Sequence, residues 1–380
     1  MRILPHYVGL AKILVVLFFL SACAQANNGK VIAVKNSLDF DRLELVSISY
    51  ESFLKLKDAH TASFKIVNQE SKEEYPYQIE MLGQDTPQNI LIQVFVPALS
   101  EVKLVVEAGQ ASAISSKTYA RYVPERLDDF AWENDVVAFR MYGEALEGRN
   151  NDAQGMDIWV KRTNDLVIDR WYKSDDYHKD YGEGLDYYSV GQTLGAGDIA
   201  GYSNGTIYYS KHYRTYDILD NGPLRSTFIL NFEPWEVDGT KVNVSKTISI
   251  DAGTQLNRIV LDFDIDNAEE VIIAAGIARR KEPGQVIDKH QEGIFGYWEP
   301  EHGDDGITGI GMIFNQPIDS VDYTDTQYLS LFQAKAGVPT EYYVGGAWNK
   351  AGRITNVNEW LVYLEQQKRA LANPLEIKIN

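Results

Sequence analysis

Cysteine is almost absent from this sequence. Cys23 is the only one in 380 residues, so the chain cannot form an internal disulfide. Basic residues are also in deficit, because 36 lysines and arginines are outnumbered by 54 aspartates and glutamates, which gives a net charge of −18. This balance argues against nucleic acid as a partner. It fits a solvated protein that binds a neutral ligand, or an anionic ligand through a local cluster of arginine and histidine.

Several familiar catalytic and binding motifs are also missing. The sequence contains no Gly-x-Ser-x-Gly elbow, no Walker loop and no His-Glu-x-x-His. The segment Gly195–Gly201 superficially matches a dinucleotide loop, but no buried parallel strand precedes it and no helix follows. The six histidines show no cluster of three or four metal ligands, and we interpret the acidic segment Glu299–Asp305 as a solvated loop. The sequence therefore predicts neither a cofactor nor a metal site.

The N-terminal segment predicts export and lipidation. An apolar run over residues 13–20 is too short to span a membrane alone. Leu20-Ser-Ala-Cys23 then matches a bacterial lipobox, in which the cysteine is lipidated and becomes the new N-terminus. The alternative is an ordinary cleaved signal with a chance cysteine. We predict a signal peptide over residues 1–22, lipidation at Cys23 and a polar tether over residues 23–30.

The same segment predicts where the protein resides. The residue after Cys23 is Ala24 rather than aspartate, which favours the outer membrane over the inner membrane. No acidic run follows, so nothing in the sequence suggests export to the cell surface. We predict a protein that faces the periplasm and contacts the membrane only through its lipid anchor, with no obligate protein partner evident.

Alternation of apolar and polar residues predicts the fold. Apolar residues make up 44% of the chain, which is enough for a full core. Between Val31 and about Gly109 the alternating runs are short and separated by turn residues, which predicts a small Ig-like β-sandwich over residues 31–112. Residues 110–117 contain few large apolar side chains and predict a linker.

Beyond residue 118 the predicted strands are longer and richer in aromatic residues. Runs such as Met156–Lys161 and Val242–Ile250 alternate without an interleaved helical pattern, which predicts large antiparallel sheets stacked face to face. The predicted fold class is therefore all-β, with the small N-terminal sandwich followed by a large antiparallel β-sandwich, of the supersandwich type, over residues 118–380.

A single helix is predicted near the C-terminus. Asn358 can cap it, and Pro374 follows its end. Its apolar residues recur near helical spacing at Trp360, Leu361, Leu364 and Leu371. This helix is expected to cover an edge or a face of a sheet.

The segment Tyr177–Gly197 has a composition that neither a core strand nor a simple connection requires. Its 21 residues include four tyrosines, five glycines, one histidine and four charged residues. Glycine allows sharp turns and close approach to a ligand, while His, Asp, Glu and Tyr supply hydrogen bonds and proton transfer. We predict that this loop forms one wall of a functional site.

Histidines and arginines beside the aromatic strands are the other candidate site residues. His178 and His212 each adjoin a tyrosine, and Arg140, Arg214 and Arg225 lie in or next to predicted strands. The presence of any one of these residues is equally well explained by a hydrogen bond or ion pair that only stabilises the fold. Together with 23 tyrosines and 7 tryptophans they favour a carbohydrate site, because aromatic faces stack on sugar rings while Arg, Asp and Glu bind hydroxyls and acid groups.

An ordered set of short motifs resembles the DUF4861 family. These motifs are Val123–Asp135, Ala138–Gly143, Gly155–Lys161, Tyr177-His178, Gly182–Tyr188, Gly191, Gly195-x-Gly197 and Gly222–Arg225. Members of this family resemble lipoproteins or secreted proteins of polysaccharide-utilising Bacteroidetes. They are similar to a dehydratase that acts on uronic-acid-terminated oligosaccharides of the algal polysaccharide ulvan. The resemblance implies an acidic oligosaccharide as the substrate.

Dehydration of a terminal glucuronic acid determines which groups such a site needs. The C5 proton is removed and the C4 hydroxyl leaves as water, so an arginine must neutralise the carboxylate while negative charge develops. A base and an acid are also required. We predict His178, or alternatively His212, as the base and Tyr188 or Tyr213 as the acid. The predicted substrate-binding residues are Arg140, Arg214, Arg225, Glu183, Asp186 and Trp159.

Two other functions fit the same residues. A glycoside hydrolase would use two carboxylates at a defined separation, and Asp180, Glu183 and Asp186 are close enough in the loop to provide them. A non-catalytic glycan-binding lipoprotein would use the aromatic residues and the tether equally well, but it leaves the histidines and arginines without a special purpose.

Overall fold

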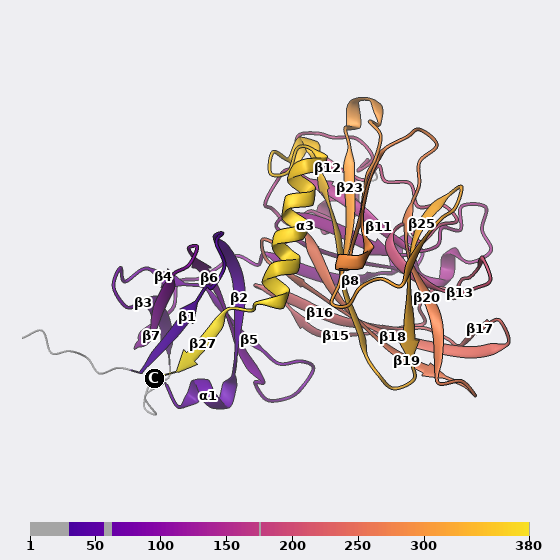
Figure 1. Ribbon diagram of the computed structural model, residues 1–380. Helices are drawn as coiled ribbons and strands as arrows, with labels where there is room; N and C mark the ends of the chain where they lie inside the picture. Colours follow the sequence, from indigo (N-terminus) through magenta and orange to yellow (C-terminus); the bar gives the residue numbers. More distant parts are fainter. Residues whose placement is uncertain (1–29, 57–62, 175, 380) are drawn as a thin grey trace, which may run out of the picture.

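The computed structural model describes residues 30–56, 63–174 and 176–379. The predicted signal peptide, Cys23 and all of the tether except Lys30 lie outside these residues. The described chain consists mainly of antiparallel strands, which confirms the all-β prediction (Figure 1). None of the helices in these three ranges is long and apolar enough to cross a membrane.

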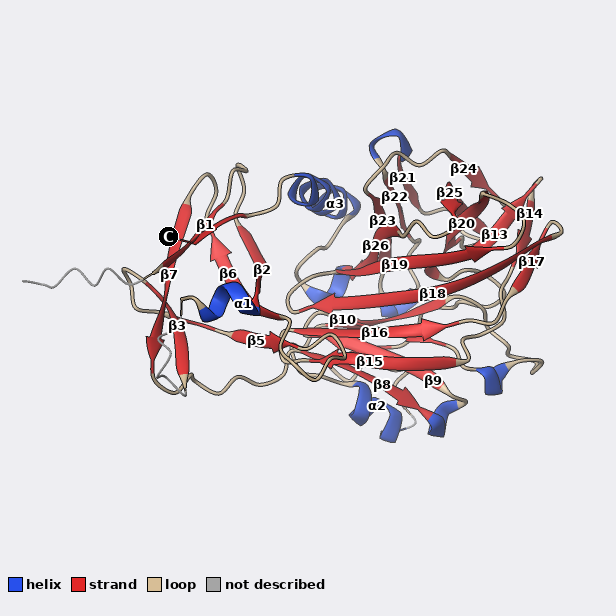
Figure 2. Cartoon of the chain, turned by 90° about the horizontal axis from the view of Figure 1, so that it is seen from below, coloured by secondary structure: helices blue, strands red, loops and turns tan. Residues whose placement is uncertain are grey.

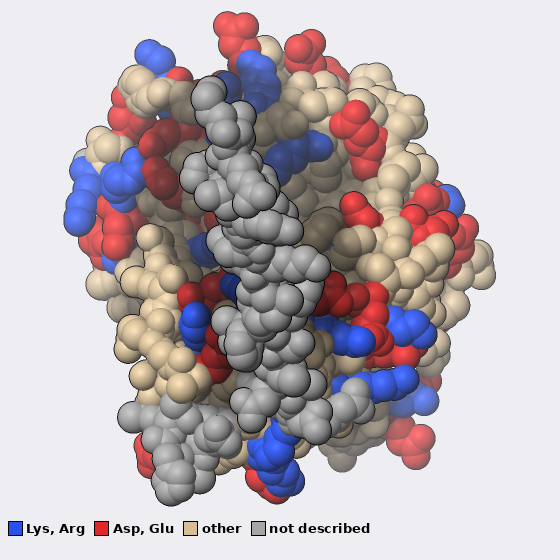
Figure 3. Space-filling model, turned by 90° about the vertical axis from the view of Figure 1, so that its left-hand side faces the viewer, with Lys and Arg blue, Asp and Glu red and all other residues tan. Residues whose placement is uncertain are grey.

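The first domain is a small β-sandwich of two sheets around one apolar core (Figure 1, indigo to purple). One sheet has the strand order β27-β1-β7-β3-β4 and the other has the order β2-β6-β5. Its elements are β1 (Val31–Lys35), β2 (Arg42–Ser49), α1 (Tyr50–Leu54), β3 (Phe64–Asn68), β4 (Glu74–Tyr75), β5 (Tyr77–Glu80), β6 (Asn89–Val96), β7 (Glu101–Ala108) and β27 (Glu376–Ile379). Lysines and arginines are interspersed with acidic residues on the end of the molecule that this domain forms (Figure 3).

The last strand of the chain returns to this first domain. β27 pairs antiparallel with β1, so that Ile32 lies opposite Ile379. Leu375 and Ile377 pack against the core of the first domain. The predicted division of the chain, which placed residues 118–380 in the large sandwich, does not include this return, because a strand of four residues has too little alternation to reveal its partner.

The second domain is a large sandwich of three sheets. A nine-stranded sheet has the order β15-β16-β18-β19-β26-β23-β22-β21, with β17 paired to β18. Its strands are β15 (Thr215–Asn221), β16 (Arg225–Asn231), β17 (Trp235–Val237), β18 (Thr240–Asp251), β19 (Leu256–Ile265), β21 (Gln285–Lys289), β22 (Ile294–Trp298), β23 (Thr308–Phe314) and β26 (Thr340–Trp348).

Two five-stranded sheets pack with this long sheet. The first, called the β8–β12 sheet, has its strands in sequential order: β8 (Thr118–Val123), β9 (Asp129–Asn134), β10 (Val137–Met141), β11 (Met156–Lys161) and β12 (Gly184–Leu185). The second has the order β14 (Thr206–Tyr208), β13 (Ala196–Ser203), β20 (Glu270–Ala278), β25 (Gln327–Lys335) and β24 (Ser320–Tyr323). Phe139, Phe228 and Ile273, one from each of the three sheets, lie in one buried core.

Two helices cover faces of these sheets that point away from that core (Figure 2). α2 (Ile168–Ser174) lies on the outer face of the β8–β12 sheet and was not predicted from the sequence. One side chain stabilises its N-terminus: the Glu133 carboxylate accepts hydrogen bonds from the backbone N–H groups of Val167 and Ile168. α3 (Val357–Ala372) is the predicted C-terminal helix and packs on the nine-stranded sheet.

Two glycines of β23 make room for α3. A Cβ atom at Gly311 would lie 2.8 Å from the Leu364 side chain, and one at Gly309 would lie 3.2 Å from Trp360. The indole N–H of Trp360 donates to the carbonyl of Ile310, 3.2 Å away. The sheet therefore accepts two large helical side chains because it has no side chains of its own at these positions.

The predicted cap of α3 was wrong by two residues. The N-cap is Asn356, whose side chain accepts from the backbone N–H groups of Asn358 and Glu359. Asn356 has an extended backbone and is followed three residues later by a glutamate, which is the usual spacing of a capping box. Asn358 lies within the first turn.

We predict that replacing Trp360 by alanine destabilises the protein by about 3–5 kcal/mol, because it leaves a cavity over Gly309. Urea unfolding followed by circular dichroism measures the change. Val362→Ala is the matched control, since Val362 lies in the same helix with 50% of its surface exposed, and its effect should remain within about 0.5 kcal/mol. Equal losses in the two variants would contradict the packing role of Trp360.

Candidate functional site

The segment Tyr177–Gly197 crosses from the outer face of the β8–β12 sheet to the start of β13. It adds β12 beside β11, with Lys161 opposite Gly184. Gly184 has φ +121°, and a Cβ atom there would lie 2.0 Å from the carbonyl oxygen of Val160. Only glycine fits this contact, and Asp186 follows two residues later, directly after β12.

A buried arginine lies under this segment. Arg140 of β10 is 4% exposed, and its guanidinium contacts three aspartates. Its Nη2 lies 2.6 Å from Asp157 Oδ2 and 3.1 Å from Asp186 Oδ2, and its Nη1 lies 3.6 Å from Asp129 Oδ2. The rings of Tyr142 and Trp159 flank the guanidinium at 5.0 and 5.4 Å. Asp129, Asp157 and Asp186, with Arg140, are called the Arg140 cluster below.

The Arg140 cluster contains three carboxyl groups but only one guanidinium, so one arginine cannot neutralise all three carboxylates. Burial raises the pKa of Asp129 to about 7, against a partial lowering by Arg140 and Arg126. Burial also raises the pKa values of Asp157 and Asp186 above their ordinary range. Asp129 Oδ1 and Arg140 Nη1 are buried without a hydrogen-bond partner among the described residues. The cluster therefore tends to retain a proton near neutral pH.

His178 lies at the rim of the cluster. Its Nδ1 is 2.8 Å from the backbone carbonyl oxygen of Asp186 and 3.7 Å from the Asp186 carboxylate. Since a carbonyl oxygen can only accept a hydrogen bond, Nδ1 carries the proton in the neutral ring and Nε2 keeps its lone pair. The side chain is 61% exposed, so Nε2 is accessible to a ligand.

Arg126 and Tyr142 also lie beside the cluster, and Tyr142 is 7% exposed. The half-buried Arg126 lies next to the Tyr177 hydroxyl and Asp129. Burial alone would lower the pKa of its guanidinium, but the hydrogen bond to Tyr177 and the charge of Asp129 raise that pKa above its ordinary value. Arg126 forms no ion pair with any described residue. The Tyr142 hydroxyl also has no hydrogen-bond partner within the described ranges, and burial followed by the charge of Asp157 raises its pKa above the ordinary value.

Four residues predicted from the sequence therefore come together here. Arg140, Asp186 and Trp159 form the floor of the site, and His178 forms part of its rim. Arg140 lies beneath this rim with its charge already engaged, so it is placed to hold neighbouring groups rather than to contact a ligand.

The other predicted residues lie elsewhere. The Tyr188 hydroxyl donates to the carbonyl of Gly195 at 2.9 Å, and the Tyr213 hydroxyl donates to the carbonyl of Asp128. Both tyrosines are buried. His212 Nε2 lies 2.8 Å from Asp152 Oδ1 in a separate pocket of about 270 Å³, although its ring is 6.5 Å from that of Tyr142.

The remaining charged candidates have protein partners. Arg214 pairs with Glu147 at 2.8 Å, and Glu183 pairs with Arg170 at 2.8 Å. Arg225 lies at the junction of the two domains, 2.6 Å from Asp251 and 3.3 Å from Glu80 of β5. Its contacts are therefore those of an interdomain anchor.

Sequence reasoning missed Arg126, Tyr142, Asp129 and Asp157. Arg126 and Asp129 lie in the motif Val123–Asp135, and Tyr142 lies in Ala138–Gly143. Their presence in those motifs was a signal, but no spacing rule brings a residue of a 3₁₀ turn (Pro124–Arg126) next to a loop 50 positions away.

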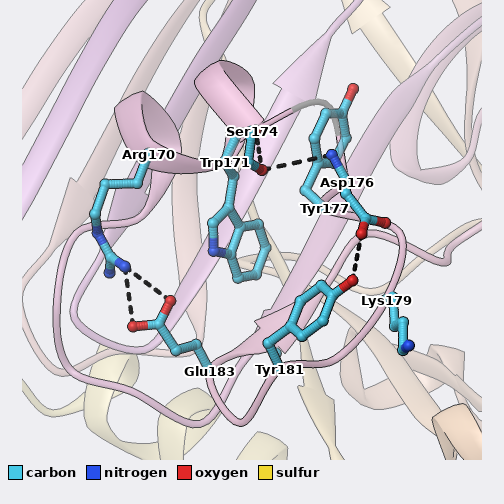
Figure 4. A pocket seen from close by; sticks show the side chains of 9 residues that line it. Arg170, Trp171, Ser174, Asp176, Tyr177, Lys179, Tyr181 and Glu183 are labelled. Carbon is cyan, nitrogen blue, oxygen red and sulfur yellow. Dashed lines mark hydrogen bonds and ion pairs between the residues drawn. The ribbon is translucent and has the colours of Figure 1, made fainter.

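A pocket of about 450 Å³ lies beside the cluster (Figure 4). Trp171, Tyr177, Tyr181 and Glu183 are among its lining residues, so part of the predicted loop does form the wall of a cavity. Within residues 30–56, 63–174 and 176–379, no group of three or more His, Cys, Asp or Glu residues is arranged to hold a metal ion.

Comparison with known proteins places the chain in a family and a fold. A family model described as a domain of unknown function, DUF4861, matches residues 34–377. "Uncharacterized protein P7" of Formosa agariphila is 29% identical over 99% of this chain and 100% of its own length.

Two solved structures from Enterococcus faecalis share the fold. An α-mannosidase has a TM-score of 0.51 and a protein of glycosyl hydrolase family 38 has a TM-score of 0.53, each at 8% identity over 92% of this chain. The chain spans about half the length of these proteins, 46% and 47% respectively. At this identity the likeness shows the fold alone.

We predict that Asp129→Asn gains stability relative to the wild type as pH rises. The folded-state pKa of Asp129, about 7, lies above its ordinary value of 3.8, so the wild type loses the linked stability between about pH 4 and pH 7. The asparagine has no proton to lose. Between pH 5 and pH 8 the unfolding free energy of the variant minus that of the wild type should increase by roughly 1–3 kcal/mol.

Urea titrations at several pH values measure this difference. Asp264→Asn, at an exposed position of β19, is the control and should show no such trend. A difference between Asp129→Asn and wild type that stays flat or falls with pH would contradict the raised pKa.

Proposed function

The chain belongs to the DUF4861 family, and from its site we propose that it is a carbohydrate-active enzyme, a hydro-lyase acting on oligosaccharides. The substrate carries a uronic acid at its non-reducing end, as in ulvan-type oligosaccharides. The reaction removes the C5 proton and the C4 hydroxyl and leaves a 4,5-unsaturated sugar. No cofactor is required.

One observation carries this proposal. Arg126, His178 and Tyr142 lie beside the Arg140 cluster. Among the described residues, Arg126 forms no ion pair, although it neighbours the Tyr177 hydroxyl and Asp129, and His178 Nε2 and the Tyr142 hydroxyl have no hydrogen-bond partner. These are the three groups that the elimination needs: a cation for the carboxylate, a base with an available lone pair, and a protonated acid.

The steps follow from these groups. The Arg126 guanidinium pairs with the uronate carboxylate and stabilises the charge that develops as the C5 proton leaves. His178 Nε2 takes that proton, the electron pair forms the C4–C5 double bond, and the C4–O bond breaks. Tyr142 gives its proton to the departing oxygen, which leaves as water. A proton then passes from His178 to Tyr142 through solvent and restores the enzyme.

This assignment keeps His178 as the base but changes its partners. All three tyrosines are buried, but the hydroxyls of Tyr188 and Tyr213 donate to backbone carbonyls. The Tyr142 hydroxyl has no hydrogen-bond partner among the described residues, so we assign it as the acid. Burial raises its pKa above the ordinary value, so the phenol is protonated in the resting enzyme. Arg126 replaces Arg140, Arg214 and Arg225 as the carboxylate ligand, because those three arginines already have carboxylate partners.

The alternative functions receive less support. The solved structures with this fold are an α-mannosidase and a family 38 glycosyl hydrolase, which favours carbohydrate as the substrate class. A hydrolase needs two available carboxylates, but Asp180, Glu183 and Asp186 are each paired with an arginine. A purely glycan-binding protein does not require the free base and acid.

Localisation is part of the proposal. We place the enzyme at the outer membrane, anchored through a lipid at Cys23 and facing the periplasm, where oligosaccharides produced by other enzymes are available. Cys23→Ser should release the protein from the membrane fraction of a bacterial host and abolish labelling by a radioactive fatty acid. Continued labelling of the variant would contradict lipidation at Cys23.

The reaction is tested with oligosaccharides that carry a saturated uronic acid at the non-reducing end. We expect ultraviolet absorbance from the new double bond and the loss of one water from the oligosaccharide mass. Gain of one water and release of a reducing sugar would instead identify a hydrolase. Binding without a change in mass would identify a glycan-binding protein.

Single variants test the three assigned groups. His178→Asn and Tyr142→Phe should each lower kcat by about 10²- to 10⁴-fold, because each removes an acid–base group. Arg126→Gln should raise KM by about 10-fold or more, because it removes a charged hydrogen bond to the carboxylate. His290→Asn, on a half-buried histidine bonded to Asp288 and outside the site, should leave turnover unchanged. Wild-type rates in His178→Asn would eliminate it as the base.

A further inference from the structure

We infer that the pocket in Figure 4 is a subsite for the second sugar of the substrate, whose ring stacks on Tyr181 while Lys179 donates to its oxygens. This inference rests on the proposed function, in which the terminal uronic acid lies at Arg126 and His178. It assigns a specific binding role to a part of the loop that the reaction itself does not use.

The pocket has the size and the surfaces of a sugar site. Its volume of about 450 Å³ lies within the range of roughly 300–1,000 Å³ that small-molecule sites occupy. Tyr181 and Trp171 both present rings to it (Figure 4). Tyr181 is 65% exposed, so its ring is accessible to a ligand.

Tyr177 connects the pocket with the proposed reaction site. Its ring lines the pocket and lies 4.5 Å from the His178 ring, and its hydroxyl neighbours Arg126. Behind it, Trp171 stacks on Trp159 at 5.7 Å, and Trp159 flanks Arg140. One aromatic side chain therefore separates the two spaces, so adjacent sugars of one oligosaccharide can occupy them.

The charges of the pocket leave one donor available. Arg170 and Glu183 form an ion pair across it (Figure 4). The Asp176 carboxylate accepts a hydrogen bond from the Tyr181 hydroxyl, and the Asp176 backbone N–H donates to Ser174 Oγ. Lys179 pairs with no carboxylate among the described residues, and its Nζ lies 5.3 Å from the centre of the Tyr181 ring. An ammonium group beside an exposed ring can donate to the hydroxyls or acid groups of a sugar that stacks on that ring.

Substrate length tests the subsite. The two substrates are a terminal uronic acid as its methyl glycoside, which has no second sugar, and a disaccharide with the same uronic acid. The wild type should show kcat/KM several-fold to tenfold higher for the disaccharide, the range that one aromatic contact and one hydrogen bond provide. Equal values for the two substrates would overturn the inference.

Variants then locate the preference. Tyr181→Ala and Lys179→Gln should each lower kcat/KM for the disaccharide by about three- to tenfold and leave the methyl glycoside unchanged. Lys173→Gln is the matched control, since Lys173 is exposed at the end of α2 and does not line the pocket. An equal loss on both substrates would show that Tyr181 supports the reaction site instead, and it would overturn the subsite.

Calorimetric binding separates failure of the subsite from failure of the proposed reaction. If neither substrate is turned over, the dehydratase function is wrong, but the subsite still requires that the disaccharide bind more tightly than the methyl glycoside. It also requires that Tyr181→Ala remove that difference. Equal affinity of both compounds, or no binding of either, would overturn the subsite on its own.

Discussion

A guanidinium that has left water needs counter-charges inside the protein, and the site depends on how Arg140 meets this requirement. Its three aspartates come from the start of β9, the start of β11 and the residue after β12. Three segments that are distant in the sequence are therefore held at one point. An ion pair buried in this way adds little net stability, but removing one partner strands a charge at a cost of about 3–5 kcal/mol. The main effect of the cluster is therefore to fix the relative positions of the three segments that carry its aspartates.

The position of His178 follows from this arrangement. The same residue, Asp186, gives its carboxylate to Arg140 and its backbone carbonyl to the imidazole. The tautomer of the histidine is thereby linked to the buried charge below it. Tyr142 and Arg126 are also neighbours of the cluster. A change in the protonation of its aspartates would therefore change the electrostatic potential at His178, Tyr142 and Arg126. The buried Arg140 cluster therefore helps to position His178, Tyr142 and Arg126.

The sequence predicted the architecture better than the site, for a physical reason. Alternation along strands such as β18 reports burial directly, so the two sandwiches and the terminal helix could be predicted. The composition of Tyr177–Gly197 indicated a loop of which part lines a cavity, but not the direction of each side chain. Tyr187 and Tyr188 show this limit, because the first reaches Thr308 and the second is buried with its hydroxyl on Gly195. Arg126 lies in a turn without periodicity, and only tertiary packing brings it beside Tyr177.

The return of β27 to β1 also has a consequence for biosynthesis. The first domain is begun at residue 31 and completed by residues 376–379, so its outer sheet edge stays open until almost the whole described chain has been made. An open edge strand is a template for pairing with other chains, and contacts of such long sequence separation form slowly. The small domain, although first to be synthesised, is therefore the last to be closed.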